Sequence, residues 1–206
     1  MLDGYLAVGN KCAVDLAAWN LPVSPERALE ILKHKGFRVV EVNLIQLARG
    51  CVGRSHYQRG ALISQAPDVM DCSTLAKWLY GQAGIWLPRH SIDQAEMGNF
   101  VPLSQAQAGD LVFTKGVKPY FHNPSCQIGH VGMVTEQETV IHAANSKRGV
   151  AEDRLEDFVD ENFRTIRRIM SPSMITLESP ADRMVEWSGQ IRNIIVQNLT
   201  QEDEAT

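Results

Sequence analysis

The sequence predicts an α+β fold with a central antiparallel sheet, and three observations carry this prediction. A helical pattern covers Asp71 to Tyr80, with its apolar residues spaced at the helical period. Short apolar strand patterns gather between residues 110 and 170. Two of these strand patterns are separated by a few polar residues, as in a hairpin.

Composition indicates a globular chain. The 206 residues are 44% hydrophobic and 21% charged, which excludes a disordered protein, and the length predicts one or two domains. No run approaches the roughly 18 apolar residues of a membrane-spanning helix, so we expect no membrane span. The net charge is −4, from 20 Lys and Arg against 24 Asp and Glu, so a basic surface for nucleic acid is not expected.

The cysteines and the N-terminus bear on the compartment. Four cysteines occur without a Cys-x-x-Cys pair, which disfavours a redox dithiol or a zinc ribbon: Cys12, Cys51, Cys72 and Cys126. Asp3 stands where a signal peptide has positive charge, and Gly9-Asn10-Lys11 interrupts the apolar stretch. We therefore expect a cytoplasmic chain, or a secreted or periplasmic one if the sequence is a mature or trimmed form.

The first helix is predicted from local signals. Ser24 is a good N-cap, Pro25 suits the first helical position, and Gly36 suits the C-terminal end. The next segment, residues 38–47, is ambiguous. Its valines favour a strand, whereas its leucines favour a helix that ends at Gly50.

The remaining elements follow in order. Residues 115–129 are rich in Gly, Pro, Asn and Ser, which predicts a loop. Strands are predicted at 110–113, 131–135, 139–144 and 163–170. A last helix is predicted from Pro180, and its apolar stripe indicates that it docks on something: Met184, Trp187, Ile191, Ile194 or Ile195, and Leu199. The chain ends in an acidic tail.

Cys72 falls in the first turn of its predicted helix. There the unpaired backbone N–H groups and the helix dipole favour a thiolate. Helical spacing places Cys72 on one face with Leu75, Ala76 and Leu79, so its sulfur points toward the body of the domain. The alternative is a small buried apolar residue without chemistry.

His130 and His142 lie on the two strands of the predicted hairpin. A turn with an odd number of residues places both on the same face, and a three-residue turn centred at Glu136 makes them direct neighbours, with Cβ atoms about 5 Å apart. A neutral imidazole oriented by a second ring can take a proton from a thiol. Two structural histidines are the alternative, and an even turn would separate the rings.

Six segments in this order resemble the NlpC-type, papain-like cysteine peptidases, which cut peptides of the bacterial cell wall. The resemblance covers about residues 40 to 155. The segments are Tyr57-Gln-Arg-Gly60, Asp71-Cys72-Ser73, Leu87-Pro88-Arg89-His90-Ser91, Gly109-Asp110-Leu111-Val112-Phe113, Gly129-His130-Val131-Gly132-Met133 and Val140-Ile141-His142-Ala143.

The resemblance implies a papain-like fold with the nucleophile at the N-terminus of a helix packed on the sheet. Cys72 is then the nucleophile, His130 the general base and later acid, and His142 the residue that orients His130. Tyr57 is implied beside the thiol, where it and the Cys72 backbone N–H hold the oxyanion. The implied catalytic domain is 40–170, between an N-terminal extension, 1–39, and a C-terminal helix and tail, 171–206.

The resemblance also implies a substrate cleft. Asp71 is implied to reach a free amine of the substrate, and Ser73, Arg89 and Ser91 to line the cleft, where Arg89 suits a carboxylate. The alternatives are a helix-capping Asp71, an N-cap Ser91 and a surface ion pair at Arg89.

The implied reaction is hydrolysis of an amide bond in peptidoglycan stem peptides or their fragments, such as the D-glutamyl to diamino-acid bond, through a thioester acyl-enzyme. No cofactor is implied, and the expected partner is a peptidoglycan-derived peptide. Departures from the family are the flanks and the long 115–129 segment, whose Tyr120, His122 and Cys126 could cover the cleft.

Three alternatives stay open. His122, Cys126, His130 and His142 are residue types that bind zinc. The same thioester could be resolved by an amine or alcohol, which would make the protein an acyltransferase, or the protein could be an amidase on a non-wall substrate. A catalytically idle binding module is the third alternative.

Overall fold

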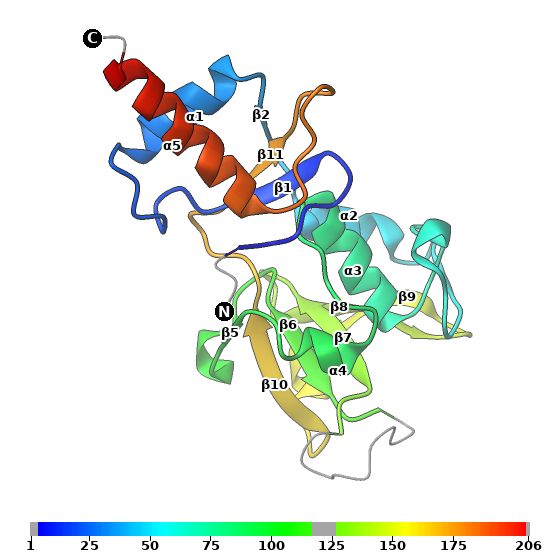
Figure 1. Cartoon of the computed structure of the whole chain (residues 1–206). Coiled ribbons are helices and arrows are strands. Elements are labelled where there is room, and N and C mark those ends of the chain that lie inside the picture. Colours follow the sequence, from blue (N-terminus) through cyan, green and yellow to red (C-terminus); the bar gives the residue numbers. More distant parts are fainter. Residues whose placement is uncertain (1–3, 117–126, 205–206) are drawn as a thin grey trace. The chain divides into compact units, whose positions relative to one another are not determined.

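The structure is a computed structural model, which describes residues 4–116 and 127–204 (Figure 1). The chain forms two compact units. The first is built from Met1–Val42, Gly81–Trp86 and Ser171–Thr206, and the second from Asn43–Tyr80 and Leu87–Met170. No helix among the described residues is long and apolar enough to cross a membrane.

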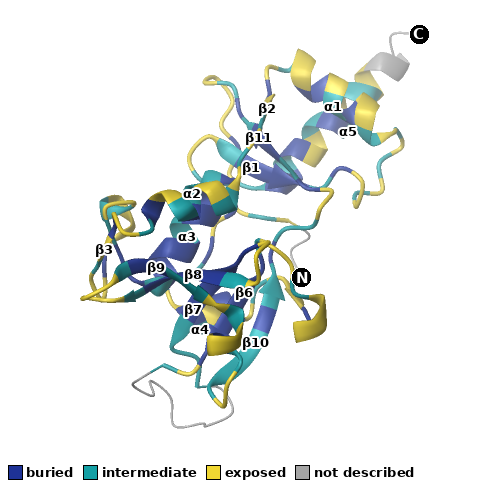
Figure 2. Cartoon of the chain, turned by 180° about the vertical axis from the view of Figure 1, so that it is seen from behind, coloured by how far each residue is buried: buried dark blue, intermediate teal, exposed yellow. Residues whose placement is uncertain are grey.

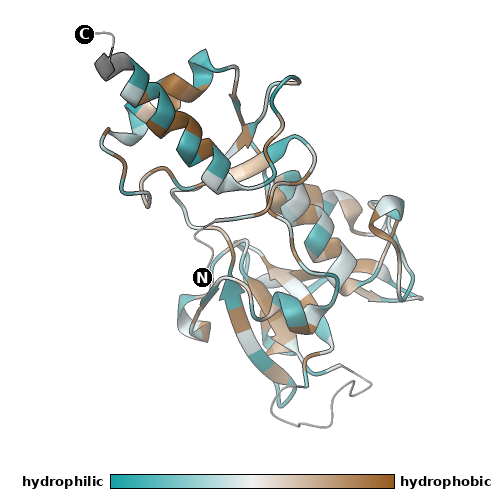
Figure 3. Ribbon diagram, viewed as in Figure 1, coloured by the Kyte–Doolittle hydropathy of each residue, from teal (hydrophilic) through white to brown (hydrophobic). Residues whose placement is uncertain are grey.

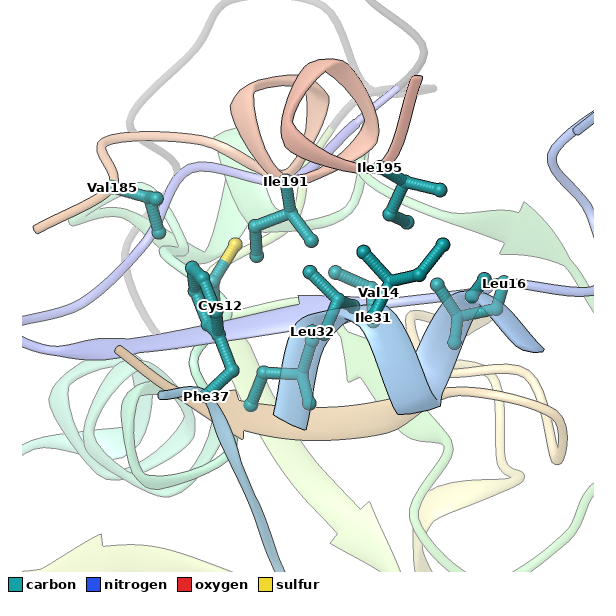
Figure 4. Packing of buried hydrophobic residues seen from close by; sticks show 11 residues of the cluster. Cys12, Val14, Leu16, Ile31, Leu32, Phe37, Val185, Ile191 and Ile195 are labelled. Atoms are coloured by element: carbon teal, nitrogen blue, oxygen red, sulfur yellow. The ribbon is translucent and has the colours of Figure 1, made fainter. Parts of the chain in front are cut away.

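The first unit joins the two ends of the chain in one sheet. Its three antiparallel strands lie in the order β1 (Lys11–Val14), β11 (Ile175–Glu178) and β2 (Arg38–Val40). Helices α1 (Pro25–His34) and α5 (Ser188–Glu204) pack around its core (Figure 4). That core includes Leu32, Phe37, Leu177, Ile191 and Ile195, each at most 2% exposed.

The prediction of α1 is confirmed at both ends. The Ser24 Oγ accepts a hydrogen bond from the Arg27 backbone N–H at 3.3 Å, and Pro25 is the first helical residue. Gly36 follows the C-cap with a φ of 89°, which favours glycine. The ambiguous segment that follows, residues 38–47, contains both predicted elements. The strand β2 comes first, and α2 (Leu44–Cys51) is the next element along the chain.

The predicted start of the last helix at Pro180 is wrong, since α5 begins at Ser188. Trp187 forms an isolated β-bridge with Leu6, and the Tyr5 backbone N–H donates to the Ser188 Oγ at 3.0 Å. Pairing with a segment far away in sequence therefore keeps the residues before Ser188 out of the helix. Docking of the helix is confirmed, although Met184 is 66% exposed.

The second unit is built on a six-stranded sheet in which every neighbouring pair is antiparallel. Buried residues concentrate on its central strands and on α3 (Figure 2). Most residues of β10 are hydrophilic, and Ile166 is the one residue of this strand that is buried (Figure 3). The strand order is β5 (Asn99–Phe100), β10 (Phe163–Arg168), β6 (Leu111–Thr114), β7 (His130–Val134), β8 (Thr139–Asn145) and β9 (Gly149–Arg154).

Helix α3 (Cys72–Gln82) packs on this sheet with the face predicted from its spacing. Around Cys72, the helix residues Leu75, Ala76 and Leu79 surround a small space together with strand residues Leu111, Met133 and Ile141. Short elements complete the unit: the parallel pair β3 (His56–Tyr57) and β4 (Val69–Met70), and α4 (Ser91–Gln94). The predicted α+β fold with a central antiparallel sheet is confirmed.

The predicted hairpin of β7 and β8 is confirmed with a different turn centre. Thr135 donates its backbone N–H to the Thr139 carbonyl at 2.9 Å, and the two side-chain hydroxyls lie 2.6 Å apart. The turn therefore has three residues but is centred on Gln137, one residue later than predicted. Glu138, the last residue of the turn, has a positive φ of 56°.

Candidate active site

Cys72 occupies the first helical position of α3 because Asp71 caps the helix. The Asp71 Oδ1 accepts hydrogen bonds from the Thr74 backbone N–H at 2.9 Å and from the Thr74 Oγ1 at 2.8 Å. The Cys72 residue stays partly exposed. Its thiol interacts with the backbone N–H of Val131, the residue that follows His130. The thiol therefore lies where β7 begins.

The register of the hairpin places both histidines on one face of the sheet. His142 lies opposite Gly132, and His130 is its diagonal neighbour rather than its direct partner, because of the later turn centre. The rings still meet: the His130 Nε2 and the His142 Nδ1 are 2.7 Å apart, with the rings edge to face at 80°. A Cβ at Gly132 would lie 3.2 Å from the His142 Cβ, so glycine permits this approach.

Two residues that sequence reasoning missed extend the histidine pair. The His142 Nε2 lies 2.9 Å from the Asp153 Oδ2. Arg148 donates to both Asp153 oxygens, at 2.8 and 2.5 Å. Asp153 lies on β9 two residues beyond Ala151, the direct partner of His142. Its role could not be found from sequence because the pairing of β8 with β9 contains an irregularity at Ala143/Asn145.

Phe158 was also missed, and it packs against both histidine rings. Its ring is stacked on His130 with centroids 6.0 Å apart and meets His142 edge to face at 4.8 Å. Phe158 is itself buried. This contact limits rotation of both imidazoles and removes them from water.

Burial keeps the reacting groups uncharged at neutral pH. Burial raises the pKa of the Cys72 thiol to about 11, with a further contribution from the Asp71 charge. Burial lowers the pKa of His130 to about 3, helped by the neighbouring His142. Burial also lowers the pKa of His142, against the opposing effect of Asp153. A neutral thiol therefore faces a neutral imidazole pair, as general-base catalysis requires.

A pocket of about 410 Å³ opens beside the thiol. Ile128 and Gly129, which lead into His130, also line it. Six of the eight residues predicted for the site come together in its wall: Tyr57, Asp71, Cys72, Ser73, Arg89 and Ser91. The other two, His130 and His142, form the hydrogen-bonded pair on the sheet.

Tyr57 reaches the pocket through strand pairing. It lies opposite Met70 in the parallel pair of β3 and β4, and β4 leads directly to Cys72. Burial and the nearby Cys72 and Asp71 raise the pKa of the Tyr57 phenol. The phenol therefore keeps its hydrogen and can donate it to a developing negative charge.

The Asp71 carboxylate is engaged inside the protein, and its implied reach toward a free substrate amine stays a prediction. Besides the helix cap, the Asp71 Oδ2 accepts from the Arg89 Nη2 at 2.6 Å and from the Gly60 backbone N–H at 2.9 Å. Burial acts against its charge, but the hydrogen bonds from Arg89 and Thr74 lower the pKa of Asp71 overall. Both oxygens are engaged inside the protein, so Asp71 supports the pocket wall.

Arg89 is likewise engaged in hydrogen bonds inside the protein. Its Nη1 donates to the Ser73 Oγ at 2.8 Å and to the Asp71 Oδ1 at 3.2 Å, and its Nη2 also donates to the Ala61 carbonyl at 3.0 Å. The implied role of Arg89 as partner of a substrate carboxylate stays a prediction. The alternative of an ordinary surface ion pair is wrong, because Asp71 is buried.

Gln94, another residue missed from sequence, is bonded to two segments near the pocket. Its Nε2 donates to the carbonyls of Ser73 and Pro88, each at 2.9 Å, and it is fully buried. This ties α4 to the start of α3. Ser91 is the first residue of α4 and His90 its N-cap, so the alternative of Ser91 as the N-cap is wrong.

The zinc alternative depends on four residues, two of which, His122 and Cys126, the structure does not describe. Tyr120, His122 and Cys126 lie outside the described residues, so the predicted covering of the cleft by the 115–129 segment stays a prediction. His130 and His142 are hydrogen-bonded to each other. Within residues 4–116 and 127–204, no group of three or more His, Cys, Asp or Glu side chains is placed to hold a metal ion.

Comparisons with known proteins agree with this arrangement. The profile described as the NlpC/P60 family matches residues 54–168. A probable endopeptidase of Corynebacterium glutamicum is 38% identical over 114 residues, which are 55% of this chain and 47% of that protein. The peptidoglycan DL-endopeptidase CwlO of Bacillus licheniformis is 33% identical over 117 residues, 54% of this chain and 24% of that protein. The match thus spans half or less of these relatives.

A solved structure supports the fold alone. NlpC2 of Trichomonas vaginalis superposes with a TM-score of 0.52 and 22% identity, over 62% of this chain and 45% of that one.

Proposed function

The chain belongs to the NlpC/P60 family, and we propose that it is a cysteine peptidase that hydrolyses an amide bond in peptidoglycan stem peptides. The family predicted from the motifs is confirmed, and so is the papain-like fold. One observation carries the proposal for this chain: Cys72 begins α3 beside β7, where His130 is hydrogen-bonded to His142 at 2.7 Å.

In the first half of the proposed reaction, the unprotonated Nδ1 of His130 takes the thiol proton of Cys72. The sulfur attacks the carbonyl carbon of the scissile amide. The oxyanion that forms is stabilised by the Cys72 backbone N–H and the Tyr57 hydroxyl. His130 then gives the proton to the departing amine, the C–N bond breaks, and a thioester joins the acyl group to Cys72.

Water completes the cycle. It gives a proton to His130 while its oxygen attacks the thioester carbonyl. Collapse of the second tetrahedral intermediate breaks the C–S bond, and His130 returns the proton to the sulfur. The products are a carboxylic acid and an amine, and no further reactant is required.

The substrate class is proposed from the relatives. One of them is named a peptidoglycan DL-endopeptidase, and the D-glutamyl to diamino-acid bond is the bond we propose for this chain. The pocket of about 410 Å³ beside Cys72 has the size of a site for part of a short peptide.

The proposal is tested with purified stem peptides. We expect the full chain to release products with a new C-terminal D-glutamyl carboxylate and a new diamino-acid amine, detected by mass spectrometry. Cys72→Ala should abolish these products. Ser104→Ala, a change in an exposed short helix, is the matched control and should cleave normally. Absence of cleavage in every stem peptide, with Cys72 still reactive toward iodoacetamide, would refute the substrate class.

A further inference from the structure

The histidine pair is one part of a longer hydrogen-bonded chain that ends at the protein surface. The chain runs from His130 through His142 and Asp153 to Arg148, with contacts of 2.7, 2.9 and 2.5–2.8 Å. The side chain of His142 is 9% exposed, that of Asp153 24% and that of Arg148 47%. A surface ion pair is thus connected to the candidate general base.

The hydrogen-bonding roles in this chain can be assigned from its outer end. Arg148 only donates, and an ionised carboxylate only accepts. Asp153 is ionised at neutral pH, because the hydrogen bonds from Arg148 lower its pKa to about 2. The His142 Nε2 must therefore carry the hydrogen in the 2.9 Å contact with Asp153.

The positions of the hydrogens on His142 and His130 follow from the hydrogen bond to Asp153. A neutral imidazole has one N–H, so His142 with its hydrogen on Nε2 presents an acceptor at Nδ1. The His130 Nε2, 2.7 Å away, must then donate. The single hydrogen of a neutral His130 is thereby placed on Nε2, and its Nδ1 carries a lone pair. This is the tautomer in which His130 can accept a thiol proton.

We propose that Asp153, held by Arg148, is a positioning residue that sets the tautomers of His142 and His130 and so leaves the His130 Nδ1 free to act as the base toward Cys72. The proposal deepens the proposed function, and its kinetic readout depends on that function.

The local backbone is built to hold Arg148 in place. The Asn145 Oδ1 accepts from the backbone N–H groups of Lys147 and Arg148, at 3.0 and 3.1 Å. Gly149 follows with a φ of 65°, a conformation that favours glycine, and begins β9. Arg148 therefore sits in the turn just before β9, and its side chain reaches the carboxylate of Asp153 within that strand.

The kinetic test compares two ion pairs of similar chemistry. Asp153→Ala should lower kcat about 10- to 100-fold, the range seen for outer residues that hydrogen-bond to a functional histidine, with little change in KM. Arg148→Gln should act in the same direction but less strongly. Glu156→Gln removes the exposed Arg154–Glu156 pair, which has no contact with the histidines, and should leave kcat unchanged. A normal kcat for Asp153→Ala would refute the proposal.

A spectroscopic test separates positioning from a merely structural role and needs no substrate. With ¹⁵N-labelled histidine, NMR shifts distinguish an Nε2–H from an Nδ1–H imidazole. The full chain should show the Nε2–H tautomer at both His130 and His142, and Asp153→Ala should show a mixture. An Nδ1–H tautomer at His130 in the unmodified protein would overturn the proposal even if cleavage occurs. Correct tautomers without cleavage would instead leave the proposal standing and count against the proposed function.

Discussion

Arg89 donates to both carboxylate oxygens of Asp71, at 2.6 and 3.2 Å, in the wall of the pocket that holds Cys72. The negative charge of Asp71 is thus balanced by Arg89 inside the protein. Arg89 also donates to the Ser73 Oγ, and Asp71 accepts from the Thr74 backbone N–H. The contacts that satisfy the carboxylate therefore also hold the start of α3, the helix that carries Cys72. This relationship has a direct consequence for which substrates the pocket accepts.

A substrate ammonium group that enters the pocket finds no unpaired oxygen on Asp71. We therefore expect a stem peptide with a free N-terminal amine and the same peptide with an acetylated amine to be cleaved with similar kcat/KM. The difference should stay below about tenfold, or about 1.4 kcal/mol. The measurement is parallel kinetics on the two peptides. A preference of more than 100-fold for the free amine would show that Asp71 exchanges Arg89 for the substrate.

The pH dependence of kcat/KM should show a broad plateau. Activity requires His130 unprotonated and one proton on the Cys72–His130 pair. Because the pKa of His130 lies below its ordinary 6.5, the acid limb should fall below pH 6.5. Because the pKa of Cys72 lies above its ordinary 9.0, the alkaline limb should lie above pH 9. A narrow maximum with both limbs between pH 6.5 and 9 would contradict these shifts.

Gly132→Ala should impair catalysis through His142. The added Cβ would lie 2.3 Å from the Val140 Cγ1 and 3.2 Å from the His142 Cβ, so the strand pair must shift. We expect destabilisation of about 1–3 kcal/mol by urea unfolding and a clear loss of kcat.

The matched control for this change is Gly50→Ala, which replaces a glycine in α2 with no atom within 4 Å of the new Cβ. It should stabilise the protein, by up to about 1 kcal/mol, and leave kcat unchanged. Equal kinetics for the two variants would mean that the spacing at Gly132 does not control the histidine pair.

Tyr57→Phe removes one hydroxyl from the pocket and keeps the ring. If the phenol donates to the oxyanion, kcat should fall about 10- to 100-fold while KM changes little, because the contact forms mainly in the transition state. Steady-state kinetics on one stem peptide measure both constants. A rise in KM at constant kcat would instead assign Tyr57 to substrate binding.

Local signals account for what the sequence predicted well. The cap at Ser24 and Pro25 fixes α1 without reference to the rest of the chain. The parity of His130 and His142 survives the shift of the turn by one residue, because the turn keeps its odd length. Side-chain pairing in the turn, at Thr135 and Thr139, set the actual centre.

Non-local pairing accounts for what the sequence could not predict. The start of α5 depends on the bridge between Trp187 and Leu6, and the place of Asp153 depends on an irregular pairing of β8 with β9. The engagement of Asp71 by Arg89 depends on the course of the chain between them. None of these relationships has a periodic or capping pattern in the sequence.

The strand order of the first unit has a consequence for the order in which the protein is made. β1 and β2 pair only with β11 in their sheet, and β11 is contributed by Ile175–Glu178. The residues of the second unit all precede Ser171. On the ribosome, the half of the protein that carries Cys72 therefore emerges in full while β1 and β2 still lack their common partner, and the sheet that joins the two ends is the last to close.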